Sequence, residues 1–520
     1  MKKIAITWFS LLSFILLSTT SHSNTNPSRS ATYDMMNEVY NDLKMAIGDQ
    51  RRTWPTLEIR PGASSVLAYN KRKNIIYVDE QALAICRLFE HQERDAFAFL
   101  LAHEMTHFYQ EHHWQEAGFA TRFLSEEHHF EDHVADEKEA DLFGAFITHL
   151  AGYQSIKIIP NLFDQVYNGY RLAAELTDYP TLEERKKTAL EVCDKVKSLI
   201  QVFETANYLV ALDEHLSAVA AYEYVLQFVK YKELYSNIGA SLVAAAATHT
   251  EYGKTNFRYP IELDSDIPLR DGSDADKKEL LQKAIEYLTI ATQMDNQHYR
   301  TFVNLACAYT LDEQYENTKT LIAQLYPMVR VKKQVAELSI IQGIASAQMG
   351  YTENAKELFE EAKSLSSVAS IQQLANENIA LLKGEKTATD AIKMGFAEEK
   401  IGGIDLTYQN DFPFQTIQFA NTFTYEENQL NFHETSTAAL IHSDTEEKTV
   451  AILLNKDLQR ETLKGIGVND TYQDLKKVYS SPFKITNHAD GYFLVVPAEK
   501  LIFDMNNRNQ IVKWGVFEIY

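Results

Sequence analysis

The sequence predicts a chain of several domains, in which an α+β block precedes an array of helical repeats and a small α+β or mostly β domain follows. Three observations support this fold class. The chain has 520 residues, which at roughly 150 residues per domain suggests three or four domains. One helical pattern recurs between residues 201 and 388. After Gly384 the sequence changes to short β-branched and aromatic stretches separated by Asn, Asp and Gly.

Composition excludes wholesale disorder and argues against nucleic-acid binding. Hydrophobic residues make up 45% of the chain and aromatic residues 11%, which is enough to build packed cores. The 50 Lys and Arg residues face 72 Asp and Glu residues, which gives a formal net charge of −22. Because such a charge repels a phosphate backbone, we expect no nucleic-acid partner.

The first 23 residues have the pattern of a secretory signal peptide. Lys2 and Lys3 precede an apolar run over residues 4–17, and Ser21 and Ser23 suit a cleavage site. The run is shorter than the roughly twenty residues of a membrane span, so an uncleaved anchor is the weaker alternative. We therefore expect a periplasmic or secreted product without a stable membrane span.

Cys86, Cys193 and Cys307 are too few and too scattered for a disulfide framework. We expect them to be small core residues, although a single bridge stays open.

The α+β block is expected over residues 24–200. Short strand-like stretches at residues 57–60, 65–69 and 74–78 are followed by helical spacing at about 94–114 and 130–150. Two longer amphipathic helices after a small sheet can place polar side chains together.

The first predicted helix contains the pattern H-E-x-x-H, as His103, Glu104 and His107. Residues four apart differ by about 40° around a helix, so both imidazoles can bind one metal ion. Glu104 stands beside them, where its carboxylate can reach a water molecule at the metal without being a ligand. These residue types are those of a catalytic zinc (Zn2+) site.

The second helix offers the third ligand. Glu137 and Asp141 are again four residues apart, so Glu137 can complete a His, His, Glu set while Asp141 orients an imidazole. The alternative is a solvated acidic helix face. Five more histidines follow His107 in this part of the chain: His112, His113, His128, His129 and His133. One of them could replace a ligand or hold a second metal. The favoured interpretation is a solvated loop between the two helices.

Together these residues resemble the gluzincin zinc metallopeptidases of the HtpX and CAAX prenyl protease type. The run of residues 179–185, from Tyr179 to Arg185, is similar to the H-P-x-x-x-x-R segment of that family, with Tyr179 in place of the histidine. The resemblance implies either an oxyanion-stabilising role or a packing role for Tyr179. BepA-like periplasmic members of the family join the same core to tetratricopeptide repeats.

The repeats are expected over residues 201–388. Gly343, Ala355, Phe359 and Ala362 occupy the small and aromatic positions of a tetratricopeptide repeat, and related frames occur upstream. An ordinary helical bundle is the alternative. The polar stretch at residues 250–277 predicts a surface loop.

The C-terminal β-rich domain is expected over residues 389–520. A short helix is expected at residues 472–479, and no chemistry is evident in this domain. The strand candidates are residues 416–419, 449–454, 493–496, 501–503 and 514–519.

The sequence thus predicts a zinc-dependent endopeptidase that hydrolyses unfolded or envelope proteins, with the repeats recruiting a substrate or protein partner. The strand at residues 74–78 is expected to offer an edge on which an extended peptide pairs. The alternative function is a non-catalytic repeat scaffold or chaperone-like adaptor with a structural zinc site.

Overall fold

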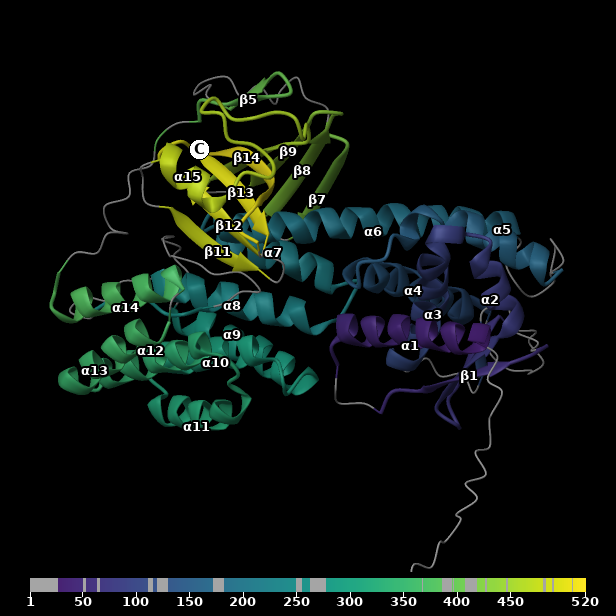
Figure 1. Cartoon of the computed structure of the whole chain (residues 1–520), viewed down its shortest axis with the longest axis horizontal. Coiled ribbons are helices and arrows are strands. Elements are labelled where there is room, and N and C mark those ends of the chain that lie inside the picture. Colours follow the sequence, from purple (N-terminus) through teal and green to yellow (C-terminus); the bar gives the residue numbers. More distant parts are fainter. Residues whose placement is uncertain are drawn as a thin grey trace, which may run out of the picture.

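The chain is multidomain and mostly helical, with a mostly β region at its C-terminal end (Figure 1). The computed structural model describes residues 27–49, 53–62, 66–110, 116–118, 130–171, 182–248, 255–261, 277–366, 368–385, 395, 397–406, 419–425, 428–445, 448–479, 483–488, 491–506 and 508–520. The predicted signal peptide lies outside these residues. Among the described residues, none of the helices combines the length and apolar character that a membrane span requires.

The first block combines helices with a small four-stranded sheet. Its helices are α1 (Pro27–Ile47), α2 (Glu80–Arg87), α3 (Glu93–Tyr109), α4 (Phe130–Leu150) and α5 (Ile159–Gly169). Its strands are β1 (Thr56–Arg60), β2 (Leu67–Asn70), β3 (Ile75–Asp79) and β4 (Glu116–Gly118). The order in the sheet is β1-β3-β2-β4, with β1 parallel to β3 and the other pairs antiparallel.

Strand β3 corresponds to the stretch predicted at residues 74–78, but its expected role as a peptide-binding edge is wrong. β1 pairs with one side of β3 from Thr56 opposite Ile75 to Arg60 opposite Asp79. β2 pairs with the other side. Because both sides of β3 already carry a ladder, an incoming peptide has no edge there.

Helix α6 (Leu182–Ala211) is 30 residues long and connects the blocks. In Figure 1 it runs from the first block to the helices beneath the C-terminal sheet. The boundary predicted at residue 200 therefore lies inside a continuous helix. Hydrophobic side chains along its length, including Val192, Leu199 and Leu209, are buried in one core cluster.

The helical array follows α6 as a series of packed helices. They are α7 (His215–Leu226), α8 (Lys232–Thr248), α9 (Lys277–Met294), α10 (Tyr299–Leu311), α11 (Tyr315–Leu325), α12 (Lys332–Gln348), α13 (Thr352–Leu365) and α14 (Ala369–Leu382). Gly343 on α12 faces the ring of Phe359 on α13, and a Cβ at 343 would stand 2.5 Å from that ring. The small and aromatic positions noted in the sequence therefore fit into one another.

The stretch predicted as a surface loop at residues 250–277 is partly wrong. Residues 255–261 are described, and the side chains of Phe257, Tyr259 and Ile261 are all buried. Phe257 lies against Phe359, with ring centroids 6.2 Å apart. The alternating apolar residues of this stretch cover the array instead of facing solvent.

The C-terminal region contains an antiparallel eight-stranded sheet of order β11-β12-β13-β14-β10-β9-β8-β7. Its strands are β7 (Asn421–Tyr425), β8 (Asn428–Glu434), β9 (Ala438–Asp444), β10 (Thr449–Asn455), β11 (Lys484–His488), β12 (Gly491–Val496), β13 (Leu501–Asn506) and β14 (Ile511–Ile519). The sheet is accompanied by a short helix, α15 (Tyr472–Val478), and by loops. A two-stranded hairpin consists of β5 (Lys400–Ile401) and β6 (Ile404–Asp405). The stretch predicted as a strand at residues 416–419 lies mostly outside the described residues.

Both faces of this sheet are buried. On β10, Val450, Ile452 and Leu454 belong to the core cluster that the helices share, while Ala451 and Leu453 belong to a second cluster with Trp514. This alternation follows from the period of two along a strand. One face therefore attaches the sheet to the helices, where Tyr208 of α6 lies 5.0 Å from the ring of Phe493 on β12.

The three cysteines are buried and none of them forms a disulfide, as expected of small core residues.

Candidate metal centre

Helix α3 carries the H-E-x-x-H motif deep inside the first block. His103 and Glu104 are fully buried, and His107 is 1% exposed. The helix packs against α1, α2, α4 and β2, and nearly every residue from Ala96 to Tyr109 is buried between them. The two imidazoles lie on one side of the helix, with their Nε2 atoms 3.1 Å apart.

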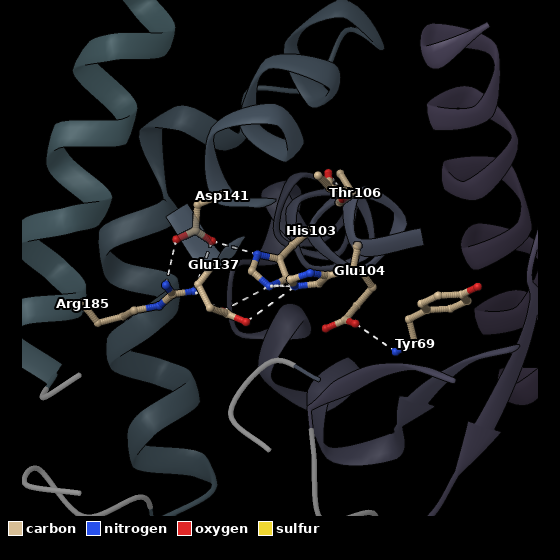
Figure 2. Close-up of polar contacts among 9 residues, drawn as sticks. Tyr69, His103, Glu104, Thr106, Glu137, Asp141 and Arg185 are labelled. Carbon is tan, nitrogen blue, oxygen red and sulfur yellow. Dashed lines mark hydrogen bonds and ion pairs between the residues drawn. The ribbon is translucent and has the colours of Figure 1, made fainter. Parts of the chain in front are cut away.

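Helix α4 brings two carboxylates to these imidazoles, as Figure 2 shows. Glu137 Oε2 lies 3.5 Å from His103 Nε2, and Glu137 Oε1 lies 3.6 Å from His107 Nε2. One turn later, Asp141 Oδ1 accepts a hydrogen bond from His103 Nδ1 at 2.8 Å. Glu137 and Asp141 are both buried.

The donor set fits a tetrahedral metal ion. Candidate ligand atoms of His103, His107 and Glu137 all lie within 4.8 Å of one another. Two ligand atoms at ~2.0 Å from one tetrahedral zinc ion stand about 3.3 Å apart. The pairwise distances of 3.1, 3.5 and 3.6 Å are close to that separation.

Asp141 selects the metal-binding tautomer of His103. A carboxylate only accepts hydrogen bonds, so its contact places the proton on Nδ1 and directs the Nε2 lone pair towards Glu137 and His107.

Glu104 is next to this group but separate from it. Its Oε2 accepts a hydrogen bond from the backbone N–H of Tyr69 on β2 at 2.9 Å. Figure 2 shows the Glu104 side chain directed towards β2, while Glu137 approaches the histidines from the other side. The sheet thus fixes the position of a buried carboxylate that is not part of the His, His, Glu group.

Arg185, in the first turn of α6, forms ion pairs with both carboxylates of α4. Its guanidinium lies 3.2 Å from Glu137 Oε2 and 3.1 Å from Asp141 Oδ2, and it is itself 3% exposed. The ring of Phe163 on α5 packs beneath it, 4.9 Å from the guanidinium carbon. Three helices therefore meet at one buried network of charges.

The charges shift the pKa values of the candidate ligands His103 and Glu137 in opposite directions. Burial alone lowers the pKa of His103, but the carboxylates of Glu137 and Asp141 outweigh this and raise it to about 10. Burial alone raises the pKa of Glu137, whereas His103, His107 and Arg185 hold it well below its usual range. The imidazoles and the carboxylates therefore stabilise each other's charged forms within this buried group.

The structure brings together five of the six predicted site residues: His103, Glu104, His107, Glu137 and Asp141. Tyr179 lies outside the described residues, as do His112, His113, His128 and His129, and the side chain of His133 is not described either.

Two contributors had no assigned role in the sequence. Arg185 is the last residue of the segment that resembles the family motif, and this position was the available sequence signal for a role at the site. The Tyr69 backbone amide has no side-chain signature at all.

No protein-family model matches this chain, and comparison with curated proteins gives no match.

Proposed function

We propose that the chain is a zinc-dependent metalloendopeptidase. The observation that carries the proposal is the buried carboxylate of Glu104, held by β2 beside a His103, His107, Glu137 group of zinc-binding geometry. A purely structural zinc site needs its ligands but has no use for a neighbouring carboxylate that binds no metal.

Each residue has a separate task in this proposal. His103, His107 and Glu137 hold the ion, and Asp141 keeps the His103 proton on Nδ1. When bound, zinc lowers the pKa of water towards neutrality and polarises a peptide carbonyl. The Glu104 carboxylate accepts a proton from the attacking water and then donates it to the leaving amine. The Tyr69 N–H keeps this carboxylate oriented.

We further infer that the block is of the gluzincin type and that the array is a tetratricopeptide-like repeat. The resemblance of residues 103–107, 137–141 and 179–185 to that family supports the first inference. The fit of Gly343 against Phe359 supports the second. The repeats would recruit an unfolded or envelope protein, or a partner, in the periplasm or outside the cell, after removal of residues 1–23.

A second candidate is a non-catalytic repeat scaffold or chaperone-like adaptor with a structural zinc site. One observation favours it: His103 and Glu104 are fully buried, and a closed site suits a structural metal.

Substitution of Glu104 separates the two functions. The mature protein is expected to contain about one zinc per chain, which His103→Ala, His107→Ala and Glu137→Ala each lose. Glu104→Gln keeps the metal, because it alters no ligand, but loses cleavage of an unfolded protein such as casein, because an amide cannot accept the proton. Glu90→Gln, on the surface of the same block, is the control. Equal turnover of wild type and Glu104→Gln would refute the peptidase proposal, and absence of zinc from the wild type would refute both functions.

A further inference from the structure

A cavity of about 380 Å³ lies where the first block, the helical array and the C-terminal sheet meet. Its lining comes from α1, α4, α6, α8, β12, β13 and β14, and includes none of the metal-centre residues. Its volume is in the range of small-molecule sites, which often form between domains. Glu204 of α6 also lines two adjoining cavities, of about 690 and 330 Å³, so it stands at their junction.

Aromatic rings form much of the cavity wall. Tyr231 lies between Phe146 and Phe203, with ring centroids 5.8 and 6.3 Å away. Tyr208 and Phe493 form a second pair, 5.0 Å apart. These five residues come from α4, α6, β12 and the segment just before α8. The faces of aromatic rings carry partial negative charge and attract cations.

Three carboxylates share the cavity with the rings: Glu204, Glu233 and Asp504. Burial raises the pKa of Tyr208 well above its usual value, and the charges of Asp504 and Glu204 raise it further. Both carboxylates therefore act on the same phenol, at the wall that Tyr208 and Phe493 form.

Among the described residues that line this cavity, one lysine, Lys513, accompanies the three carboxylates. Lys513 stands opposite Asp504 in the β13–β14 register. Lys232 is shared between Glu233, at 3.6 Å, and Asp295, at 2.7 Å. With Lys232 and its second partner Asp295 included, two lysines accompany four carboxylates among these described residues.

His149 adds no compensating charge, because burial lowers its pKa. The local charge is negative next to apolar walls, which disfavours both an anion and a purely apolar ligand.

We propose that this cavity binds an organic ammonium group, supplied by a free alkylamine or by a lysine side chain of a polypeptide. The aliphatic part of such a ligand packs against the rings of Phe146 and Phe203. Its ammonium group is attracted both by ring faces and by Glu204 and Asp504. This site is independent of the proposed peptidase activity, since it shares no residue with the metal centre.

The test compares n-pentylammonium with pentan-1-ol, which has a similar shape but no charge, by calorimetric titration of the mature protein. We expect the ammonium ion to bind at least about tenfold more tightly than the alcohol. Glu204→Gln and Asp504→Asn should each weaken ammonium binding by about tenfold and leave alcohol binding unchanged. Asp194→Asn removes the same charge from α6, where Asp194 pairs with Lys197 at 3.0 Å, and should change neither.

A tripeptide with a central lysine, blocked at both ends, distinguishes the two sources of the ammonium group. Tighter binding of this peptide than of n-pentylammonium identifies a polypeptide ligand, and the reverse order identifies a free amine. Equal affinity for pentan-1-ol and n-pentylammonium, or unchanged ammonium affinity in both carboxylate variants with wild-type circular dichroism, would overturn the proposal. So would absence of saturable binding by all three probes.

Discussion

Gly144 on α4 lies directly against the backbone of His103 on α3. A Cβ at residue 144 would stand 3.0 Å from the His103 amide nitrogen and 3.3 Å from its Cα. Gly144 follows Asp141 by three residues and Glu137 by seven, so it shares their face of α4. The missing side chain lets the two helices approach until the carboxylates reach the imidazoles.

Gly144→Ala should destabilise the protein although alanine is the better helix former. Helix propensity alone would raise the free energy of unfolding by about 1 kcal/mol. The methyl group meets backbone atoms, which cannot rotate away, so we expect a net loss of about 1–3 kcal/mol and a lower zinc content. Urea unfolding and metal analysis measure both, with Lys138→Ala, exposed on the same helix, as control. A rise in stability with full zinc content would show that the helices have room to separate.

Asp141→Asn should weaken zinc binding without abolishing it. The amide removes the charge that favours a proton on His103 Nδ1, but His103, His107 and Glu137 all remain. Loss of such a supporting carboxylate typically costs 10- to 100-fold in metal affinity. Competition with a zinc chelator measures the change. Asp164→Asn, whose partner is Lys186 on the surface of the same block, is the matched control and should keep wild-type affinity.

Arg185→Met should lower the free energy of unfolding by about 3–5 kcal/mol in the metal-free protein, because it leaves Glu137 and Asp141 buried without the guanidinium that pairs with both. Bound zinc should restore part of this loss, since the ion neutralises the same carboxylates. Urea unfolding with and without zinc tests both statements.

The neighbouring Lys186→Met removes one partner of the half-exposed Lys186–Asp164 pair. It should cost less than about 1 kcal/mol. Similar losses for Arg185→Met and Lys186→Met would mean that the buried network contributes no more than a surface pair.

The candidate metal centre could be predicted from the sequence because its candidate ligands follow helical spacing. His103 with His107 and Glu137 with Asp141 are both separated by four residues, and a turn of helix places such pairs on one face. The approach of the two helices depends on Gly144, whose importance appears only when the neighbouring backbone is known. The Tyr69 amide is a main-chain group, which any residue except proline would supply.

Sheet order and the course of irregular segments were harder to predict. β3 was recognised as a strand, but its parallel pairing with β1, which gives it two neighbours, is not encoded in its own residues. Residues 255–261 were expected on the surface because of the polar sequence around them. Phe257, Tyr259 and Ile261 alternate, and that period of two was the available signal for burial.

His215, at the start of α7, is fully buried where the helices meet the C-terminal sheet, and neither ring nitrogen hydrogen-bonds any described residue. Asp213 pairs with Lys484 at 2.5 Å, and Glu214 pairs with Lys448 at 2.7 Å. His215 Nε2 lies 3.9 Å from Asp213 Oδ1. Burial, and then the positive charges of Lys484 and Lys448, lower the pKa of His215 to about 3.

Because its pKa is lowered in the folded protein, His215 should make the free energy of unfolding fall as the pH falls. Above about pH 6.5 the imidazole is neutral in both the folded and unfolded chains. Below that pH only the unfolded chain takes up the proton, so the free energy of unfolding falls by up to about 1.4 kcal/mol per pH unit until the pH nears the folded value. His215→Gln removes this contribution, so its stability should decline less than that of the wild type between pH 7 and pH 4.5, as measured by urea unfolding. The control is His91→Gln, which removes an exposed imidazole and should retain the wild-type dependence of stability on pH. Equal slopes for wild type and His215→Gln would contradict the prediction, because they would show that His215 accepts its proton in the folded state as readily as in the unfolded one.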